Sequence, residues 1–148
     1  MTTTPNTGHG IIISPNFDEP MYILGFQNDA ENMNEIIRNY ERDEWGEPIE
    51  DENGHNCILG TGTILYARRS LQVSGSNLIL WVDEDGKGKE RPVNLKASWI
   101  HGNIVYGDAL LYYEDRNNFA NVIDMTSGDL DRFNAFCNDK TVEFSSGF

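Results

Sequence analysis

The densest group of ionisable side chains lies between Glu41 and Glu52, where seven acids accompany a single base, Arg42. Carboxylates held together by a fold create a negative potential that attracts basic surfaces. Helical residues three or four positions apart lie about 5–6 Å from one another, so Glu31 and Glu35 could extend such a band. We therefore expect a partner-binding surface made by Glu41, Asp43, Glu44, Glu47, Glu50, Asp51 and Glu52. The alternative is that these acids only keep the protein soluble.

A second charged stretch, Val82 to Asn94, could bind calcium or form a turn. Asp83, Asp85 and Gly88 fit the first, third and sixth positions of an EF-hand loop. Lysines, however, occupy two of the other ligand positions, and an asparagine stands where the bidentate glutamate belongs. The glycines tolerate the positive φ angles of a chain reversal. We therefore predict a loop tip whose opposite charges are solvated and compensate one another.

A cleft for a small molecule is an alternative to a protein-binding surface. Arginine side chains can hold a carboxylate or phosphate, and aromatic rings can line the space around it. The residues that would form this cleft are Arg68, Arg69, Trp81, Trp99, Tyr112 and Tyr113. The two arginines could equally end a strand and pair with the acidic segment.

The other reactive side chains do not form the pattern of a catalytic or metal site. The histidines are far apart in the sequence, whereas a zinc site needs three or four converging ligands. Cys137 falls on the apolar face of an expected helix, where a core role is favoured over thiolate chemistry. We therefore expect no catalytic residues, no metal and no cofactor, and we interpret the protein as non-enzymatic.

The net charge and the apolar content limit the partners and the compartment. The 148 residues include 24 acids and 11 bases, and the formal net charge of −13 repels nucleic acid phosphates. No run of about 18 apolar residues and no apolar leader occurs, so we expect a cytoplasmic protein that neither enters a membrane nor is secreted. Cys57 and Cys137 should then be reduced.

The hydrophobic pattern predicts the elements that position these residues. Apolar spacings and capping residues predict helices over 29–42 and 127–138, with one helical turn near 95–100. Strands are expected at 21–26, 56–68, 76–82, 104–114, 119–124 and 140–146, and residues 43–56 have the composition of a loop. We expect a flexible tail over 1–10 and a single α+β domain over 11–148, in which both helices pack on a mostly antiparallel sheet.

The segment from Trp81 to Asp115 carries turn residues in a characteristic order, namely Asp83-Glu84-Asp85-Gly86, Pro92-Val93-Asn94 and Ile104-Val105-Tyr106-Gly107-Asp108-Ala109-Leu110. With these motifs it resembles the core of an uncharacterised family of small proteins from bacteriophages, plasmids and other mobile elements. The resemblance implies a strand and a helix before this core, which residues 21–42 could provide. The sequence departs from the family in its acidic segment and after Asp115. The resemblance implies no catalytic residue but an origin in a mobile element.

Charge and resemblance together predict an acidic accessory protein of a phage or other mobile element. It would bind and inhibit a host protein that has a basic surface, such as a nucleic-acid-binding or defence protein, in the manner of a DNA mimic. One alternative is a small-molecule binder that sequesters a signalling metabolite. Another is a virion or structural component that makes contacts through its polar N-terminal segment.

Overall fold

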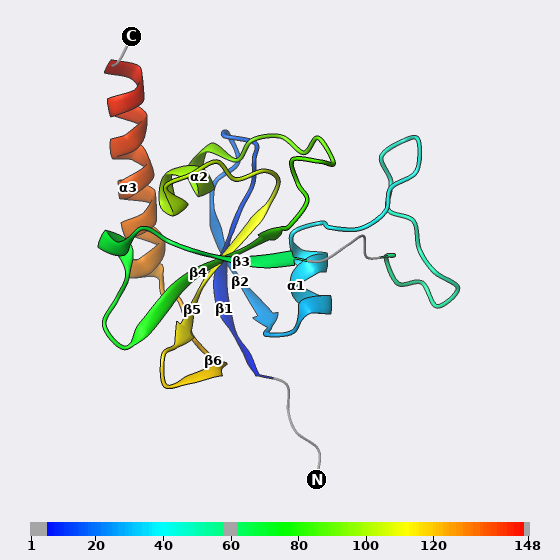
Figure 1. The fold of residues 1–148 in the computed structure, drawn as a ribbon, viewed down its shortest axis with the longest axis horizontal. Helices are drawn as coiled ribbons and strands as arrows, with labels where there is room; N and C mark the ends of the chain where they lie inside the picture. The colour runs from blue at the N-terminus through cyan, green and yellow to red at the C-terminus, as the bar shows by residue number, and fades with distance from the viewer. Residues whose placement is uncertain (1–5, 58–61, 147–148) are drawn as a thin grey trace.

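The computed structural model describes residues 6–57 and 62–146, and within these ranges six strands form one antiparallel sheet (Figure 1). The strands are β1 (Thr7–Ile13), β2 (Tyr22–Gln27), β3 (Gly62–Tyr66), β4 (Ser76–Asp83), β5 (Ala109–Asp115) and β6 (Asn118–Ile123). The strand order is β2-β1-β5-β4-β3, and β6 pairs with the last residues of β5, which follow the stretch of β5 that pairs with β1. This arrangement confirms the predicted α+β fold with an antiparallel sheet.

Three α-helices in the described residues cover the two faces of the sheet (Figure 1). They are α1 (Ala30–Ile36), α2 (Leu95–His101) and α3 (Ser127–Ser146), and a short 3-10 helix spans Arg69–Leu71. The helical turn expected near 95–100 is therefore confirmed as α2. None of these helices combines the length and the apolar composition that a membrane crossing requires.

The hydrophobic core is divided between the two faces because successive strand residues point in opposite directions. Leu78 and Leu80 of β4 pack with residues of α2 and α3 in the larger cluster. Ile79 and Trp81 point the other way and pack with residues of α1 in the smaller cluster. The central strands β4 and β5 are thus buried on both sides.

Helix α1 is shorter than the helix predicted over 29–42. Arg38 adopts a left-handed conformation with a φ of 56°. Its backbone N–H donates to the oxygen of Glu35 at 3.0 Å, and the N–H of Asn39 donates to the oxygen of Asn34 at 2.9 Å. These two bonds form a Schellman motif, which ends a helix even where the apolar spacing continues. The predicted extension to residue 42 is therefore wrong.

The C-terminal strand predicted over 140–146 is also wrong, because α3 continues through these residues. No glycine or proline interrupts the sequence between Gly128 and Ser146. Thr141 donates its hydroxyl to the oxygen of Cys137 at 2.8 Å, and Lys140 pairs with Glu143 at 3.2 Å. The predicted start is confirmed, since Thr126 and Asp129 exchange hydrogen bonds as a capping pair.

At the N-terminus, β1 begins at Thr7, so residues 7–10 belong to the sheet although we expected them in a tail. The N–H of His9 donates to Asp124 at 2.8 Å, which ties this part of β1 to the chain after β6. The strand predicted over 56–68 is confirmed for Gly62–Tyr66, and its residues 58–61 lie outside the described ranges.

Candidate functional site

Residues 41–57, which we call the acidic arm, project from the sheet beside α1 (Figure 1). Three backbone hydrogen bonds close its base: the N–H of Glu41 donates to Cys57, that of Ile49 to Glu41, and that of Cys57 to Ile49, at 2.7–2.9 Å. The three residues are eight positions apart and are therefore held in a ring. The predicted loop over residues 43–56 is confirmed, and backbone hydrogen bonds within it hold it in shape.

The acidic arm contains the same turn twice. Asp43-Glu44-Trp45-Gly46-Glu47 and Asp51-Glu52-Asn53-Gly54-His55 share their spacing. In each turn the glycine has a φ near 80°, and its N–H donates to the backbone carbonyl oxygen of the aspartate at 3.0 Å. The carboxylate of the same aspartate accepts two further backbone N–H groups. Aspartate and glycine are the residue types that such turns favour, because they supply a local acceptor and a positive φ.

The turns divide the seven acids into two groups. Asp43 and Asp51 direct a carboxylate oxygen to the backbone, and the N–H groups of His55 and Asn53 lower the pKa of Asp51. The glutamates point into solvent; they are Glu41, Glu44, Glu47, Glu50 and Glu52. The two aspartates therefore shape the arm, and the five glutamates make its outer charge.

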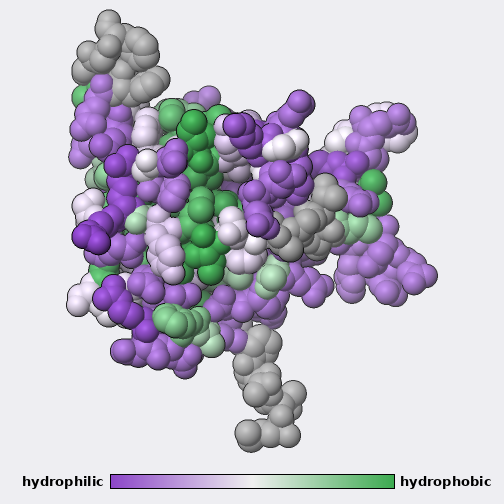
Figure 2. Space-filling view, viewed as in Figure 1, coloured by the Kyte–Doolittle hydropathy of each residue, from purple (hydrophilic) through white to green (hydrophobic). Residues whose placement is uncertain are grey.

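An apolar side chain lies among these charges. Trp45, in the first turn, has 78% of its surface exposed, and Ile49 at the base is also exposed. Figure 2 shows the projecting arm as mainly hydrophilic, with a few apolar residues on it. An exposed tryptophan on a backbone-closed turn can fill a pocket in a partner at a small entropic cost.

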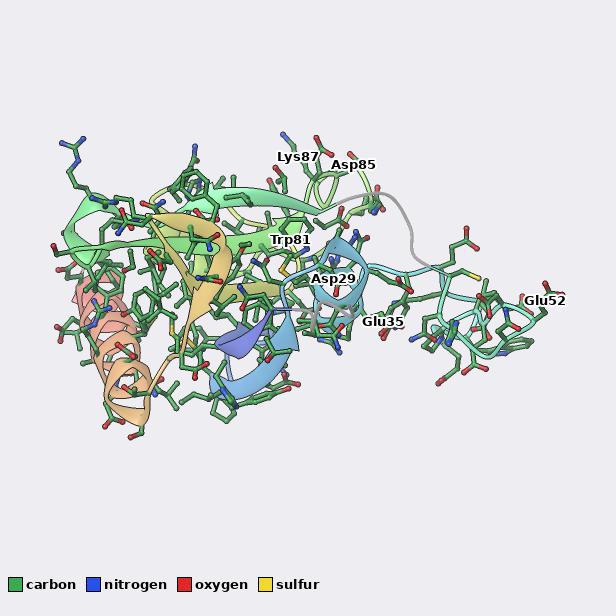
Figure 3. All side chains as sticks on the ribbon, turned by 90° about the horizontal axis from the view of Figure 1, so that it is seen from below. Asp29, Glu35, Glu52, Trp81, Asp85 and Lys87 are labelled. Carbon is green, nitrogen blue, oxygen red and sulfur yellow. The ribbon has the colours of Figure 1, made fainter. Side chains whose placement is uncertain are left out.

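The acids of α1 form a separate group at the same end of the molecule. Asp29 caps α1 by accepting the N–H of Asn32 at 2.8 Å, and Glu31 and Glu35 are exposed. In Figure 3 the side chains of Asp29 and Glu35 lie on α1, whereas Glu52 lies at the far tip of the arm. We expected one continuous acidic band along α1 and the loop, and the structure instead has two separate acidic regions.

The charged stretch 82–94 forms a partly buried ion-pair network. The Asp83 carboxylate, 1% exposed, accepts Lys89 at 3.0 Å and Arg91 at 3.5 Å. Asp108 accepts Arg91 at 2.9 Å and both Nε and Nη2 of Arg38, and these bonds raise the pKa of Arg38. The predicted solvated loop tip is therefore wrong for Asp83, Lys89 and Arg91, although their charges do compensate one another. In an EF-hand loop Asp83 would bind the calcium ion, whereas here its carboxylate pairs with the ammonium group of Lys89.

Two residues of the turn motifs in the segment from Trp81 to Asp115, Asn94 and Gly107, lie close to this network. Asn94 is fully buried, caps α2, and donates Nδ2 to the oxygens of Ile13 and Gly107 at 2.9 Å. Gly107 has a φ of 80°, and a Cβ there would lie 2.5 Å from the Arg91 guanidinium. Close packing between the turn after β4, the ion-pair network and α2 therefore explains why asparagine occurs at 94 and glycine at 107.

The residues of the alternative ligand cleft are not brought together. Trp81 and Tyr112 are buried on the α1 face, where Trp81 donates Nε1 to Asn34 at 3.1 Å. Tyr113 points to the opposite face, and its hydroxyl donates to Asp129 at 2.9 Å. Arg68 and Trp99 are the exception, because Nε of Arg68 donates to the backbone oxygen of Trp99 in α2 at 2.5 Å. Arg69 begins the 3-10 helix. The aromatic cleft predicted from the sequence is therefore not formed.

Another surface depression contains a histidine and a carboxylate that the sequence did not connect. Nδ1 of His9 lies 3.2 Å from Asp124, at a pocket of about 380 Å³ that residues of β1, β2 and α1 line. Both side chains are more than half exposed. Among the described residues that line this pocket, Thr7 carries the one hydroxyl group and none carries a thiol. Within the described residues no group of His, Cys, Asp and Glu has a geometry suited to a metal ion.

Comparisons with known proteins bear on the fold. The structure is similar to part of the small RNA methyltransferase HEN1, with a TM-score of 0.55 and 16% sequence identity. The match covers 89% of this chain and 16% of the HEN1 chain. No protein-family model matches the sequence, and no curated protein matches it. The likeness to HEN1 shows a shared fold for one part of a much longer protein.

Proposed function

We propose that this protein is a non-enzymatic accessory protein that binds a basic protein surface through its acidic arm and blocks that surface. The observation that carries the proposal is Trp45, which is 78% exposed on a turn whose backbone is closed by hydrogen bonds. An exposed tryptophan with Glu44 and Glu47 near it in the sequence combines an apolar anchor with charges that select a basic partner surface.

The two kinds of side chain have different roles in the proposed complex. The glutamates raise the association rate and make it sensitive to salt, because exposed charges interact at long range and are screened by ions. Trp45 supplies affinity when its ring leaves water and enters a pocket. A protein partner is favoured over nucleic acid because the chain carries a net charge of −13.

The mobile-element resemblance supports a host protein as the target, since accessory proteins of such elements act on the machinery of the host. HEN1 is a methyltransferase of small RNA, and at 16% identity the likeness brings neither that activity nor RNA binding to this chain. The negative field is unsuited to RNA phosphates.

The test is affinity capture from a host lysate, with quantitative binding of each captured protein. Three variants are compared with the wild type. The first is Trp45→Ala, and the second converts four glutamates of the arm to glutamine, namely Glu44, Glu47, Glu50 and Glu52. The third is a control that removes the same number of negative charges outside the arm, by converting to amides Asp18, Asp131, Asp139 and Glu143. We expect Trp45→Ala to weaken binding at every salt concentration by about 10-fold or more. The arm amides should remove the salt dependence, and the control should keep it.

Two results would contradict the proposal. One is a partner whose affinity is the same for the wild type and for both arm variants. The other is a partner that binds equally well in low and high salt, because exposed charges cannot then contribute to recognition.

A further inference from the structure

A pocket of about 200 Å³ lies between the base of the acidic arm and the ion-pair network. Its lining residues are Arg38, Asn39, Tyr40, Arg42, Asp83, Lys89 and Arg91. Four of the 11 bases of the chain therefore line one small pocket in a protein whose net charge is −13, and the two acids paired with them, Asp83 and Asp108, balance only two of these four charges. This concentration of bases favours an anion locally.

One residue that lines the pocket carries a buried hydrogen-bond donor without a partner. Asn39 is 2% exposed, and its Nδ2 forms no hydrogen bond within the described part of the chain. The amide cannot be turned over, because its Oδ1 accepts the ammonium group of Lys89 at 2.8 Å. A buried donor left unpaired is destabilising, and an acceptor that enters the pocket would relieve this cost.

The arginines are positioned by contacts that leave further donors available. Arg38 binds Asp108 through Nε and Nη2, and these bonds do not involve its Nη1. Arg42 lies over the ring of Tyr40 at 4.8 Å and binds the oxygen of Gly46 through Nη1, which leaves Nη2 and Nε. Guanidinium groups fixed in this way suit an oxyanion, because they offer several N–H groups at little entropic cost.

The backbone is strained on both sides of the pocket. In the described residues positive φ angles outside glycine occur at Arg38 (56°) and Glu90 (58°). Arg38 lines the pocket itself, and Glu90 lies between the lining residues Lys89 and Arg91. Left-handed conformations cost energy for residues other than glycine and concentrate at ligand sites.

We propose that this pocket binds an oxyanion of phosphate size, either free phosphate or the terminal phosphoryl group of a small metabolite. The guanidinium donors of Arg38 and Arg42 and the Asn39 amide surround the anion, and the Asp83 and Asp108 pairs keep the bases in place. The pocket volume suits one phosphoryl group rather than a whole nucleotide. Trp45, the anchor of the proposed protein docking, does not line this pocket, although Arg42 of the acidic arm does.

The first experiment is an NMR titration of the full chain labelled with ¹⁵N. Sodium phosphate and glycerol 3-phosphate are the two probes, and sodium chloride at equal ionic strength is the reference. We expect the chemical shifts of the Asn39 side-chain amide to change with added phosphate or glycerol 3-phosphate until the site is saturated. The probe with the lower dissociation constant identifies the source of the anion. Signals that stay in place, or that move equally in chloride, would overturn the proposal.

The second experiment compares thermal unfolding with and without phosphate, each variant against its own baseline. We expect wild type to gain roughly 3–6 °C in Tm at phosphate ten times above its dissociation constant. Arg42→Met and Asn39→Asp should lose most of this gain, whereas Arg69→Met, which removes an exposed arginine outside the pocket, should keep it. If Asn39→Asp does not fold, Arg42→Met decides alone. A full gain in Arg42→Met would contradict the assigned site.

Discussion

At the scale of single residues, buried polar side chains connect parts of the chain that are distant in sequence. Asp83, Asp108 and Asn94 are all buried, and each has partners that satisfy it. Burial of a polar group without partners is costly, so these residues specify how the turn, α2 and β5 meet. These structural contacts are sufficient to explain the two aspartates and the asparagine at these positions, without a catalytic role.

Asn94 provides the sharpest stability prediction. Asn94→Ala removes the cap of α2 and leaves the oxygens of Ile13 and Gly107 without this donor. We expect a loss of about 3 kcal/mol in the free energy of unfolding, measured by urea denaturation. Asn53→Ala, at an exposed position in the arm, should change it by less than about 0.5 kcal/mol. Equal effects of the two substitutions would show that the Asn94 bonds do not stabilise the fold.

The two free cysteines should differ in reactivity. Burial in the core raises the pKa of the Cys137 thiol to about 11, so this thiol stays protonated at pH 8. Cys57 is half-buried at the base of the arm. We expect a disulfide reagent to modify one thiol rapidly in the native protein and two in denaturant. The contribution of Cys137 to stability is full below its usual pKa and is lost as the pH rises toward about 11. Rapid modification of Cys137 at pH 8 would contradict its burial.

At the scale of elements, the end of α1 illustrates how tertiary contacts override a local pattern. A Schellman motif normally has glycine at the left-handed position, and here that position is Arg38. The strain is compensated by the bidentate contact with Asp108, 70 residues away. The apolar spacing that predicted a helix to residue 42 contains no information about this contact.

Substitutions at Arg38 separate strain from pairing. Arg38→Gly relieves the left-handed conformation but loses the ion pair, and Arg38→Ala loses the pair and keeps the strain. We expect both to lower the free energy of unfolding by about 1–3 kcal/mol, since the buried Asp108 loses a partner. The glycine variant should be the more stable of the two by about 1 kcal/mol. An alanine variant as stable as the glycine variant would mean that α1 ends differently.

At the scale of the whole molecule, the charge is unevenly distributed. The acidic arm carries five solvated glutamates on a projection, while four bases surround a pocket near its base. In Figure 3 the tip of the arm, marked by Glu52, lies far from the centre of the sheet, marked by Trp81. This separation allows the arm to change without disturbing the core.

Removing the arm tests this separation. The backbone bonds that join Glu41, Ile49 and Cys57 bring its two ends together, so a Gly-Ser-Gly linker can replace residues 43–56. We expect the Tm to stay within about 4 °C of the wild type, which is roughly 1 kcal/mol for a domain of this size. Partner binding should be lost. A protein that unfolds at a much lower temperature would show that the arm belongs to the core.

The sequence by itself determined the features that depend on near neighbours. Runs of apolar, β-branched and aromatic residues predicted the strands β2, β4, β5 and β6. The Thr126–Asp129 pair predicted the start of α3, and the composition of 43–56 predicted an irregular segment rich in acids. The repeat of Asp-Glu-x-Gly in that segment was also visible, and it signals the two turns that the structure contains. These properties are local because a turn or a cap is completed within a few residues.

Only the tertiary structure decided which charged groups meet. Arg38 and Asp108 are 70 positions apart, and Lys89 and Asn39 are 50 apart, so no spacing rule connects them. The aromatic cleft is a different case, because the alternation along one strand, which is a local property, already sends Tyr112 and Tyr113 to opposite faces. Long-range contacts arise from the packing of the whole chain, and the basic pocket therefore became visible only when α1, the turn after β4 and the base of the arm were placed side by side.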